Sequence, residues 1–273
     1  MPGCSLIDVL VEAAVASRVL LTCLVLLAFA VPTALAADTC LPAPYESPSG
    51  KDQMHLQALL EGVRPVINTA PSLAAALEEM TPDLCLADRL DNAEGYLDLD
   101  RLRIVLQRNL PSDLQRAILL HELRHLDQIH RGLCPADTLA IREHARAVFA
   151  MEADASAVSL ALAWDERQHG RVAIWDALLA WPSQADIAAR YEEARLAGAD
   201  TAAATAAAFD QWYRADDRRE RYYLDSCSAY LDRQEASRAL AAHDPLPEDF
   251  LERLCRLPDG GPYPCVEVHG GRR

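Results

Sequence analysis

A short stretch of this chain has the residue types and the spacing of a metal-dependent hydrolytic site. Residues 121–125 read HELRH, inside the helix-favouring run 114–128. On a helix, His121 and His125 lie one turn apart on the same face, so both imidazoles can hold one metal ion. Glu122 lies beside them, where a general base would take a proton from a metal-activated water. The pattern therefore predicts a zinc site with hydrolytic chemistry.

A simpler interpretation is an amphipathic helix with two partly exposed histidines and a solvated Glu122. The apolar residues of the run argue against it, because three leucines gather on one side of the helix: Leu119, Leu123 and Leu126. A helix with such a stripe is buried on that side, so the histidine face should border the core. His130 lies well round from the metal face, and we expect it to be exposed.

A catalytic zinc site needs a third protein ligand. A third histidine six residues after His125, with a glycine midway, is excluded because those positions are Gln128 and Arg131. His144 is one alternative, although its surroundings read as a polar helix surface. Glu152 is the better candidate, since it lies on a second predicted helix among alanines that would allow close helix packing. The competing interpretation places Glu152 on a solvated stripe of that helix.

The elements that must position these residues are mostly helical, because alanine is abundant and glycine and β-branched residues are sparse. The predicted fold is mainly α (α+β), with a small β-sheet or hairpin packed on the histidine helix and additional C-terminal helices. Residues 38–50 read as a loop or extended lead-in, and residues 82–92 read as irregular. The expected strands are 96–99 and 103–107, and the expected helices are 51–62, 72–79, 112–131, 138–168, 172–181, 184–196, 201–214, 220–242 and 247–254.

Two helix starts carry recognisable capping residues. Ser112 precedes the histidine helix with Gln115 three residues on, which is a capping-box arrangement. Asp137 is the expected N-cap of the next helix.

The N-terminus has the pattern of an export signal. Arg18 precedes the apolar run 19–31, and the small residues Ala34 and Ala36 predict cleavage before Ala37. The run is short for a membrane span, although an uncleaved anchor is an alternative. The predicted division is 1–36 signal peptide, 37–94 N-terminal lead-in and helices, 95–170 metallopeptidase-like core and 171–273 C-terminal helical region. We expect a periplasmic or secreted protein without stable membrane insertion after cleavage.

Cysteine content agrees with export. Six cysteines follow the predicted signal, an even number that predicts three disulfides in an oxidising compartment, with fifteen possible pairings. They are Cys40, Cys85, Cys134, Cys227, Cys255 and Cys265. None of their spacings is C-x-x-C, which argues against a structural zinc knuckle.

The charge balance limits the partners. The formal net charge is −15, so the chain is poorly suited to neutralising phosphates, and we expect no nucleic-acid partner. The same charge disfavours an anionic membrane surface.

The chain resembles the gluzincin metallopeptidases over roughly residues 95–165. The resemblance rests on the HELRH motif and on the segment Glu152-Ala153-Asp154-Ala155. It is similar in particular to compact ImmA/IrrE-type peptidases and to proteobacterial metallopeptidase domains of uncharacterised activity. The resemblance implies a zincin-like core that cleaves a peptide or protein substrate. It also implies that His121, His125 and Glu152 hold Zn²⁺ and that Glu122 is the general base.

One position departs from the gluzincin pattern. Many gluzincins carry an aspartate four residues after the glutamate ligand, where it supports a histidine. Ser156 occupies that position here. Asp154 points to another side of the helix, so its role stays open.

Three functions compete at this point. The first is an exported zinc-dependent peptidase, in which Tyr222, Tyr223 and Tyr230 are candidates to stabilise an oxyanion. The second is an exported, disulfide-stabilised helical binding protein with a structural or catalytically inactive zinc site. The third is a membrane-tethered interaction protein without a metal. The intact Glu122 favours the first, because a structural site needs no base.

Overall fold

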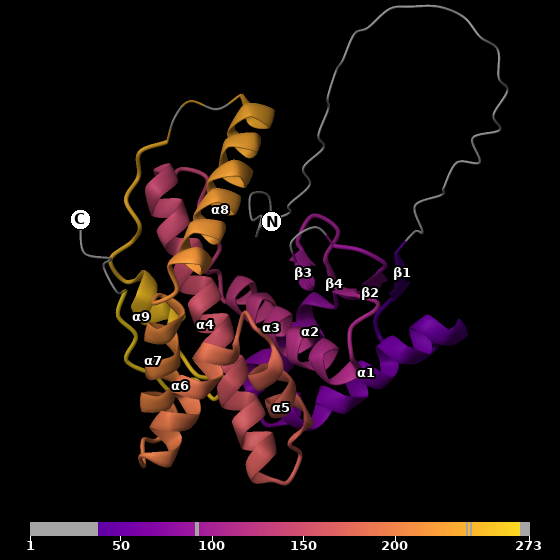
Figure 1. The fold of residues 1–273 in the computed structure, drawn as a ribbon. Coiled ribbons are helices and arrows are strands. Elements are labelled where there is room, and N and C mark those ends of the chain that lie inside the picture. The colour runs from indigo at the N-terminus through magenta and orange to yellow at the C-terminus, as the bar shows by residue number, and fades with distance from the viewer. Residues whose placement is uncertain (1–37, 91–92, 239, 241, 268–273) are drawn as a thin grey trace, which may run out of the picture.

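The computed structural model describes residues 38–90, 93–238, 240 and 242–267 (Figure 1). The predicted signal peptide at 1–36 lies outside the described residues. The strands are β1 (Thr39–Leu41), β2 (Asp83–Ala87), β3 (Gly95–Asp98) and β4 (Arg103–Gln107). The helices are α1 (Gly50–Asn68), α2 (Pro71–Met80), α3 (Ser112–His130), α4 (Ile141–Gln168), α5 (Ala173–Ala180), α6 (Ala185–Leu196), α7 (Thr201–Trp212), α8 (Asp216–Ser237) and α9 (Phe250–Leu254). The predicted α+β class, mainly helical with a small sheet, is confirmed.

The four strands form one mixed sheet in the order β1-β2-β4-β3. β3 and β4, the two strands expected in a small sheet or hairpin, pair antiparallel with Leu97 opposite Ile104. β2 joins β4 in parallel, and β1 pairs antiparallel with β2. A disulfide between Cys40 and Cys85 links directly opposed residues of β1 and β2. Among the described residues β3 is therefore an edge strand of the sheet, and it contacts α3.

The prediction of irregular structure at 82–92 is wrong where β2 forms, whereas β1 lies within the predicted loop or extended lead-in at 38–50. β2 has both faces covered: Leu84 and Leu86 enter the main core, while Cys85 and Ala87 pack with Val105 on the opposite face. A strand buried on both faces shows a continuous apolar run instead of alternation, so it lacks the period-2 signal.

α3 is the central element, because it contacts β3, β4, α1, α2, α4 and α5. In Figure 1 the sheet with α1 and α2 lies on one side of α3, and α4 with the C-terminal helices lies on the other. α4 is long and apolar enough to cross a membrane, but 94% of its apolar window is buried inside the protein. This degree of burial is typical of a helix in the core of a protein.

The helices agree with the predicted ranges within a few residues, with one clear extension. α1 continues to Asn68 instead of stopping at Gly62. A Cβ at Gly62 would come within 2.4 Å of Arg116 Nε on α3. Gly62 therefore allows two helices to pack closely and does not end α1.

Neither predicted helix cap forms. α3 follows Pro111 with no side-chain cap, and the Gln115 amide instead donates to the carbonyl of Gln107 at 2.9 Å. α4 begins only at Ile141, and Asp137 pairs with Arg233 on α8. In both cases the side chain that was predicted to cap a helix instead interacts with a residue outside that helix.

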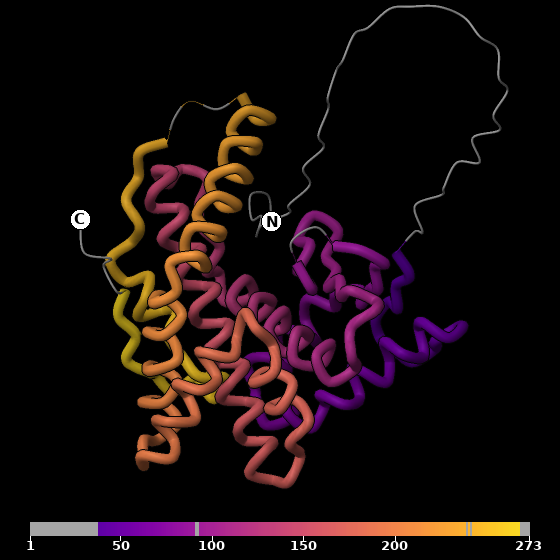
Figure 2. Tube along the Cα trace, in the orientation of Figure 1, coloured from indigo at the N-terminus to yellow at the C-terminus, as the bar shows by residue number. Residues whose placement is uncertain are grey.

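The C-terminal segment returns to the outer side of α4, where α9 packs (Figure 2). Cys255 and Cys265 close this segment with a disulfide. Cys227 carries a free thiol, so the six cysteines do not all pair with one another as predicted. The two disulfides indicate an oxidising, extracytoplasmic environment.

One apolar cluster of buried side chains extends from Leu41 in β1 to Tyr263 near the C-terminus. It contains residues from the sheet and from most of the helices. The predicted boundaries near residues 94 and 170 stay predictions.

Candidate metal centre

The two histidines of α3 are buried inside the protein. The helix is buried almost all round between Ala117 and Ile129, because it is packed on several sides. His121 and His125 lie one turn apart, with ring centroids 4.7 Å apart and ring planes at 78°. Their Nε2 atoms converge to 3.0 Å. This separation places both imidazole nitrogens at one point on the helix surface.

Glu152 reaches the same point from α4. Its Oε2 lies 3.5 Å from His121 Nε2, and its Oε1 lies 3.4 Å from His125 Nε2. Zinc bonds of about 2.0–2.1 Å at tetrahedral angles would separate neighbouring ligand atoms by about 3.4 Å. The three spacings fit one metal ion. Among the described residues these three side chains form a group whose ligand atoms all lie within 4.8 Å of one another.

Small residues explain how α4 comes close enough. Ala150, Ala153 and Ala157 on this part of α4 are all buried, and α4 packs directly against α3. Glu152 is itself buried, 7% exposed, so the interpretation of a solvated stripe is excluded. A carboxylate in such surroundings is costly unless it has a cationic or hydrogen-bonding partner.

The electrostatics of the cluster favour a positive charge at its centre. Burial alone would raise the pKa of Glu152, but the neighbouring His125 and His121 hold that pKa well below its ordinary value. Burial would lower the pKa of His125, yet the Glu152 carboxylate raises it to about 9. The donor set therefore stabilises a cation among these three side chains. A divalent metal fits this requirement better than a proton, since all three ligands can contact it at once.

Glu122 is buried next to the cluster without belonging to it. Burial raises the pKa of its carboxyl group above the ordinary value, although the neighbouring His121 and His125 act to lower that pKa. The backbone of Leu97 in β3 hydrogen-bonds to Glu122. Gly95 makes that approach possible, because a Cβ there would come within 2.4 Å of Ile118 Cγ2 on α3. Glu122 is thus a carboxyl group of raised pKa that faces the opening of the site.

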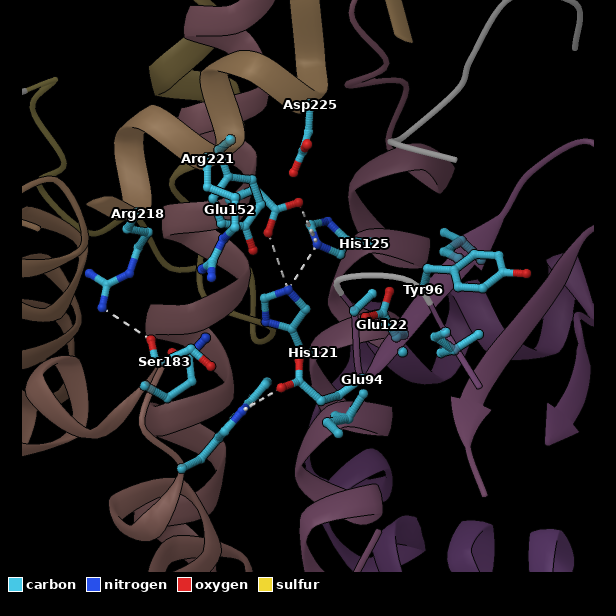
Figure 3. Close-up of a pocket in the computed structure, with 18 of the residues that line it drawn as sticks. Glu94, Tyr96, His121, Glu122, His125, Glu152, Ser183, Arg218, Arg221 and Asp225 are labelled. Atoms are coloured by element: carbon cyan, nitrogen blue, oxygen red, sulfur yellow. Dashed lines mark hydrogen bonds and ion pairs between the residues drawn. The ribbon is translucent and has the colours of Figure 1, made fainter. Parts of the chain in front are cut away.

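The cluster opens into a cleft of about 440 Å³, which is large enough for a small ligand or several residues of a peptide. His121, Glu122, His125 and Glu152 all line it (Figure 3). β3 forms one wall with Gly95, Tyr96 and Leu97. The opposite wall comes from the connection between α5 and α6 and from α7 and α8, through Trp181, Ser183, Gln184, Trp212, Arg218, Arg221, Tyr222 and Asp225.

Arg218 holds the C-terminal wall together. Its guanidinium donates to the carbonyls of Trp212 at 2.9 Å and Ser183 at 3.0 Å, and it forms an ion pair with Asp186. These contacts join α6, α7 and α8 on one side of the cleft. The helices after residue 170 therefore build half of the site, which the sequence left open.

The structure separates the three candidate tyrosines. Tyr222 lines the cleft, and burial and the Glu152 carboxylate raise the pKa of its hydroxyl group. Tyr230 donates its hydroxyl to the carbonyl of Leu139 at 2.9 Å. Tyr223 is 47% exposed and is not among the residues of the cleft. Of these three tyrosines, Tyr222 is the one that lines the same cleft as His121, His125 and Glu152.

His144, the alternative third ligand, lies elsewhere. It is buried beside Tyr230, and its Nε2 accepts a hydrogen bond from Arg233 at 2.8 Å. Burial and the Arg233 charge lower its pKa to about 4. His144 is therefore a neutral core histidine.

This depressed pKa predicts a pH dependence of stability. Between pH 6.5 and about 4 the unfolded chain protonates His144 while the folded protein does not, so the free energy of unfolding falls as pH falls through that window. From pH 7.5 to 5, the wild type should lose about 1–2 kcal/mol more than His144→Gln. Urea unfolding of EDTA-treated protein at the two pH values measures this. His169→Gln, at an exposed histidine, should keep the wild-type dependence, and parallel curves for His144→Gln would refute the prediction.

Sequence reasoning missed a buried polar network behind the histidines. Asp154 accepts two hydrogen bonds from Arg124, at 2.7 and 2.9 Å, and one from Tyr263 at 2.6 Å. Gln128 contacts both Asp154 and His125. The spacing of Gln128, three residues after His125 on one helix, was the available signal. Nothing local pointed to Tyr263, which lies 109 positions after Asp154.

The Ser156 side chain hydrogen-bonds to the start of α6. Its hydroxyl accepts a hydrogen bond from Gln184 at 3.1 Å, which ties α4 to the start of α6. The aspartate that many gluzincins use at this position is therefore not replaced by Ser156.

Comparison with known proteins identifies a family for this chain. A family model described as "Putative metallopeptidase family (DUF6782)" matches residues 34–265, most of the chain. No curated protein and no solved structure matches. The matched range contains the two histidines, the two glutamates and the C-terminal wall of the cleft.

Proposed function

The chain belongs to this DUF6782 metallopeptidase family, and we propose that it is a zinc-dependent peptidase of the gluzincin type. The observation that carries the proposal is the convergence of His121, His125 and Glu152 to 3.0–3.5 Å beside a buried Glu122, at the floor of a cleft. Family membership and this cluster indicate a metal. Two imidazoles and one carboxylate, with a glutamate base beside them on an H-E-x-x-H helix, are the donor set of one class of catalytic zinc site, and this supports zinc as the metal.

The proposed chemistry divides between the metal and the protein. Zinc, when bound, supplies the Lewis acidity that polarises a peptide carbonyl and lowers the pKa of a water molecule. Glu122 accepts the proton of the attacking water and passes it to the leaving amine. The hydroxyl of Tyr222 faces the same cleft, where it can donate a hydrogen bond to the carbonyl oxygen as negative charge develops.

The alternative is an exported helical binding protein with a structural metal. Structural zinc sites normally use four protein ligands, whereas three ligands converge among the described residues. The open position and the neighbouring Glu122 favour the enzyme. We further propose that the enzyme is exported through its N-terminal signal and acts on peptides or proteins in the periplasm or outside the cell.

Metal content tests the site directly. Purified wild-type protein should contain about one zinc per chain, and His121→Ala and Glu152→Ala should each lose it, because two remaining ligands bind zinc weakly. Mass spectrometry of the metal after dialysis measures this. His130→Ala is the matched control, since His130 lies on the same helix and pairs with Glu79. Wild-type protein that takes up no divalent metal, or Glu152→Ala protein that keeps it, would contradict the proposed ligand set.

A further inference from the structure

The second ring nitrogen of His125 points away from the metal cluster and into a buried network. Its Nδ1 lies 2.9 Å from Gln128 Oε1. The Gln128 Nε2 donates to the carbonyl of Met151 at 2.9 Å and to Asp154 Oδ2 at 2.6 Å. His125, Gln128 and Asp154 are all buried, so water does not replace these contacts.

The partners of Gln128 decide which way its amide faces. The Met151 carbonyl can only accept a hydrogen bond, and the Asp154 carboxylate already accepts from Arg124 and Tyr263. The Gln128 –NH₂ group must therefore face these two acceptors, and its oxygen must face His125. An oxygen in that place requires a proton on Nδ1 of His125. A neutral imidazole protonated at Nδ1 keeps its lone pair on Nε2, the atom that meets His121 and Glu152.

We propose that Gln128, oriented by Asp154, is a positioning residue that holds His125 in the tautomer which presents Nε2 to the metal. The inference rests on the proposed metal site and adds two residues to it. It also assigns Asp154 a role, although this residue contacts none of the three ligands. Gln128 on α3 thus gives His125 the hydrogen-bonding support that Ser156 does not provide.

The network is anchored at its far end by the C-terminal segment. Arg124 donates to both oxygens of Asp154 and also to the carbonyls of Arg256 at 2.7 Å and Leu254 at 3.3 Å. Tyr263 adds its hydrogen bond from the loop that Cys255 and Cys265 close. Asp154 therefore has little freedom to rotate, so Gln128 has a fixed partner.

Two substitutions of Gln128 separate this role from simple packing. Gln128→Met keeps the side-chain length but removes every hydrogen bond. Gln128→Glu keeps an oxygen acceptor for His125 Nδ1 but introduces an acid beside Asp154. If Gln128 positions His125, the methionine variant should bind Zn²⁺ about 10–100-fold more weakly than wild type, and the glutamate variant should lose less. If Gln128 only fills space, the glutamate variant should bind Zn²⁺ more weakly than the methionine variant.

The control is Gln115→Met, the same change at another fully buried glutamine of α3, whose partners are Gln107, Arg108 and His55. It should lower stability and leave zinc affinity within about threefold of wild type. Zn²⁺ itself is the probe, titrated in competition with a chromophoric chelator at one pH. Equal affinity of Gln128→Met and wild type, or an equal loss in Gln115→Met, would overturn the proposal while the metal site stands.

A measurement on the wild type needs no variant to fold. In zinc-loaded protein with ¹⁵N-labelled histidine, NMR should show His125 bound through Nε2, with a slowly exchanging proton on Nδ1. Binding through Nδ1 would overturn the proposal. Wild-type protein that binds no divalent metal would overturn both this inference and the proposed function, so the two failures are distinguishable.

Discussion

Glu122→Gln is expected to lower kcat/KM for peptide hydrolysis by about 10²–10⁴-fold, the range associated with loss of a general base. Glutamine has the same size but does not accept a proton. The carboxyl group of Glu122 is suited to this task, because its burial raises its pKa toward the range in which a base can also return the proton. Glu122 is not one of the three clustered ligands, so the variant should still bind about one zinc per chain.

The measurement is cleavage of a broad peptide library, with metal content determined on the same samples. Glu79→Gln makes the same chemical change at an exposed carboxylate that pairs with His130, and it should retain wild-type activity. Equal cleavage by wild type and Glu122→Gln would remove the enzyme hypothesis. The binding protein with a structural metal would then be the better account of this site.

Arg124→Met is expected to reduce the free energy of unfolding by about 3–5 kcal/mol, which is the usual effect of breaking a buried ion pair from one side. Arg124 is fully buried and pairs with Asp127 and Asp154, both of which are also fully buried. Asp127 and Asp154 raise the pKa of Arg124 despite its burial, so it remains charged. Its removal leaves two buried carboxylates with fewer partners and takes one hydrogen-bond donor from each of two carbonyls of the C-terminal segment.

Arg116→Met is the matched control on the same helix. Arg116 pairs with Asp113 at the same three-residue spacing that Arg124 has to Asp127, but that pair is partly exposed. An exposed pair contributes about 0–1 kcal/mol, so the control should change stability little. Urea unfolding of EDTA-treated protein with intact disulfides compares the two variants. Similar losses in both would mean that the buried network contributes no more than a surface pair.

Local pattern was sufficient for α3 and for the pair β3 and β4. Helix geometry places residues four apart on one face, so the convergence of His121 and His125 needed no tertiary information. The strand-like runs before α3 predicted two strands in a small hairpin or sheet, and the structure pairs them antiparallel with Leu97 opposite Ile104. Both signals are properties of a few consecutive residues.

Local pattern failed where a distant partner decided the structure. β2 lacks alternation because both of its faces are covered, and β1 pairs only because β2 is present. Gln115 reads as a capping residue from its spacing, yet its amide finds the carbonyl of Gln107 in the sheet. Cys227 reads as one of six paired cysteines, yet no described residue brings a second sulfur to it.

The sequence by itself determined that two imidazoles and the Glu122 carboxylate lie on one helix with a buried side, in a chain that is mostly helical. It also favoured Glu152 over His144, from its alanine-rich surroundings. Only the tertiary structure decided the 3.4–3.5 Å approach of Glu152 to the histidines, the walls of the cleft and the network from Tyr263 through Asp154 and Gln128 to His125. The physical reason is the separation of the partners along the sequence. Periodicity shows which nearby residues share a helix face, whereas the site depends on side chains from distant segments that only tertiary packing brings into contact.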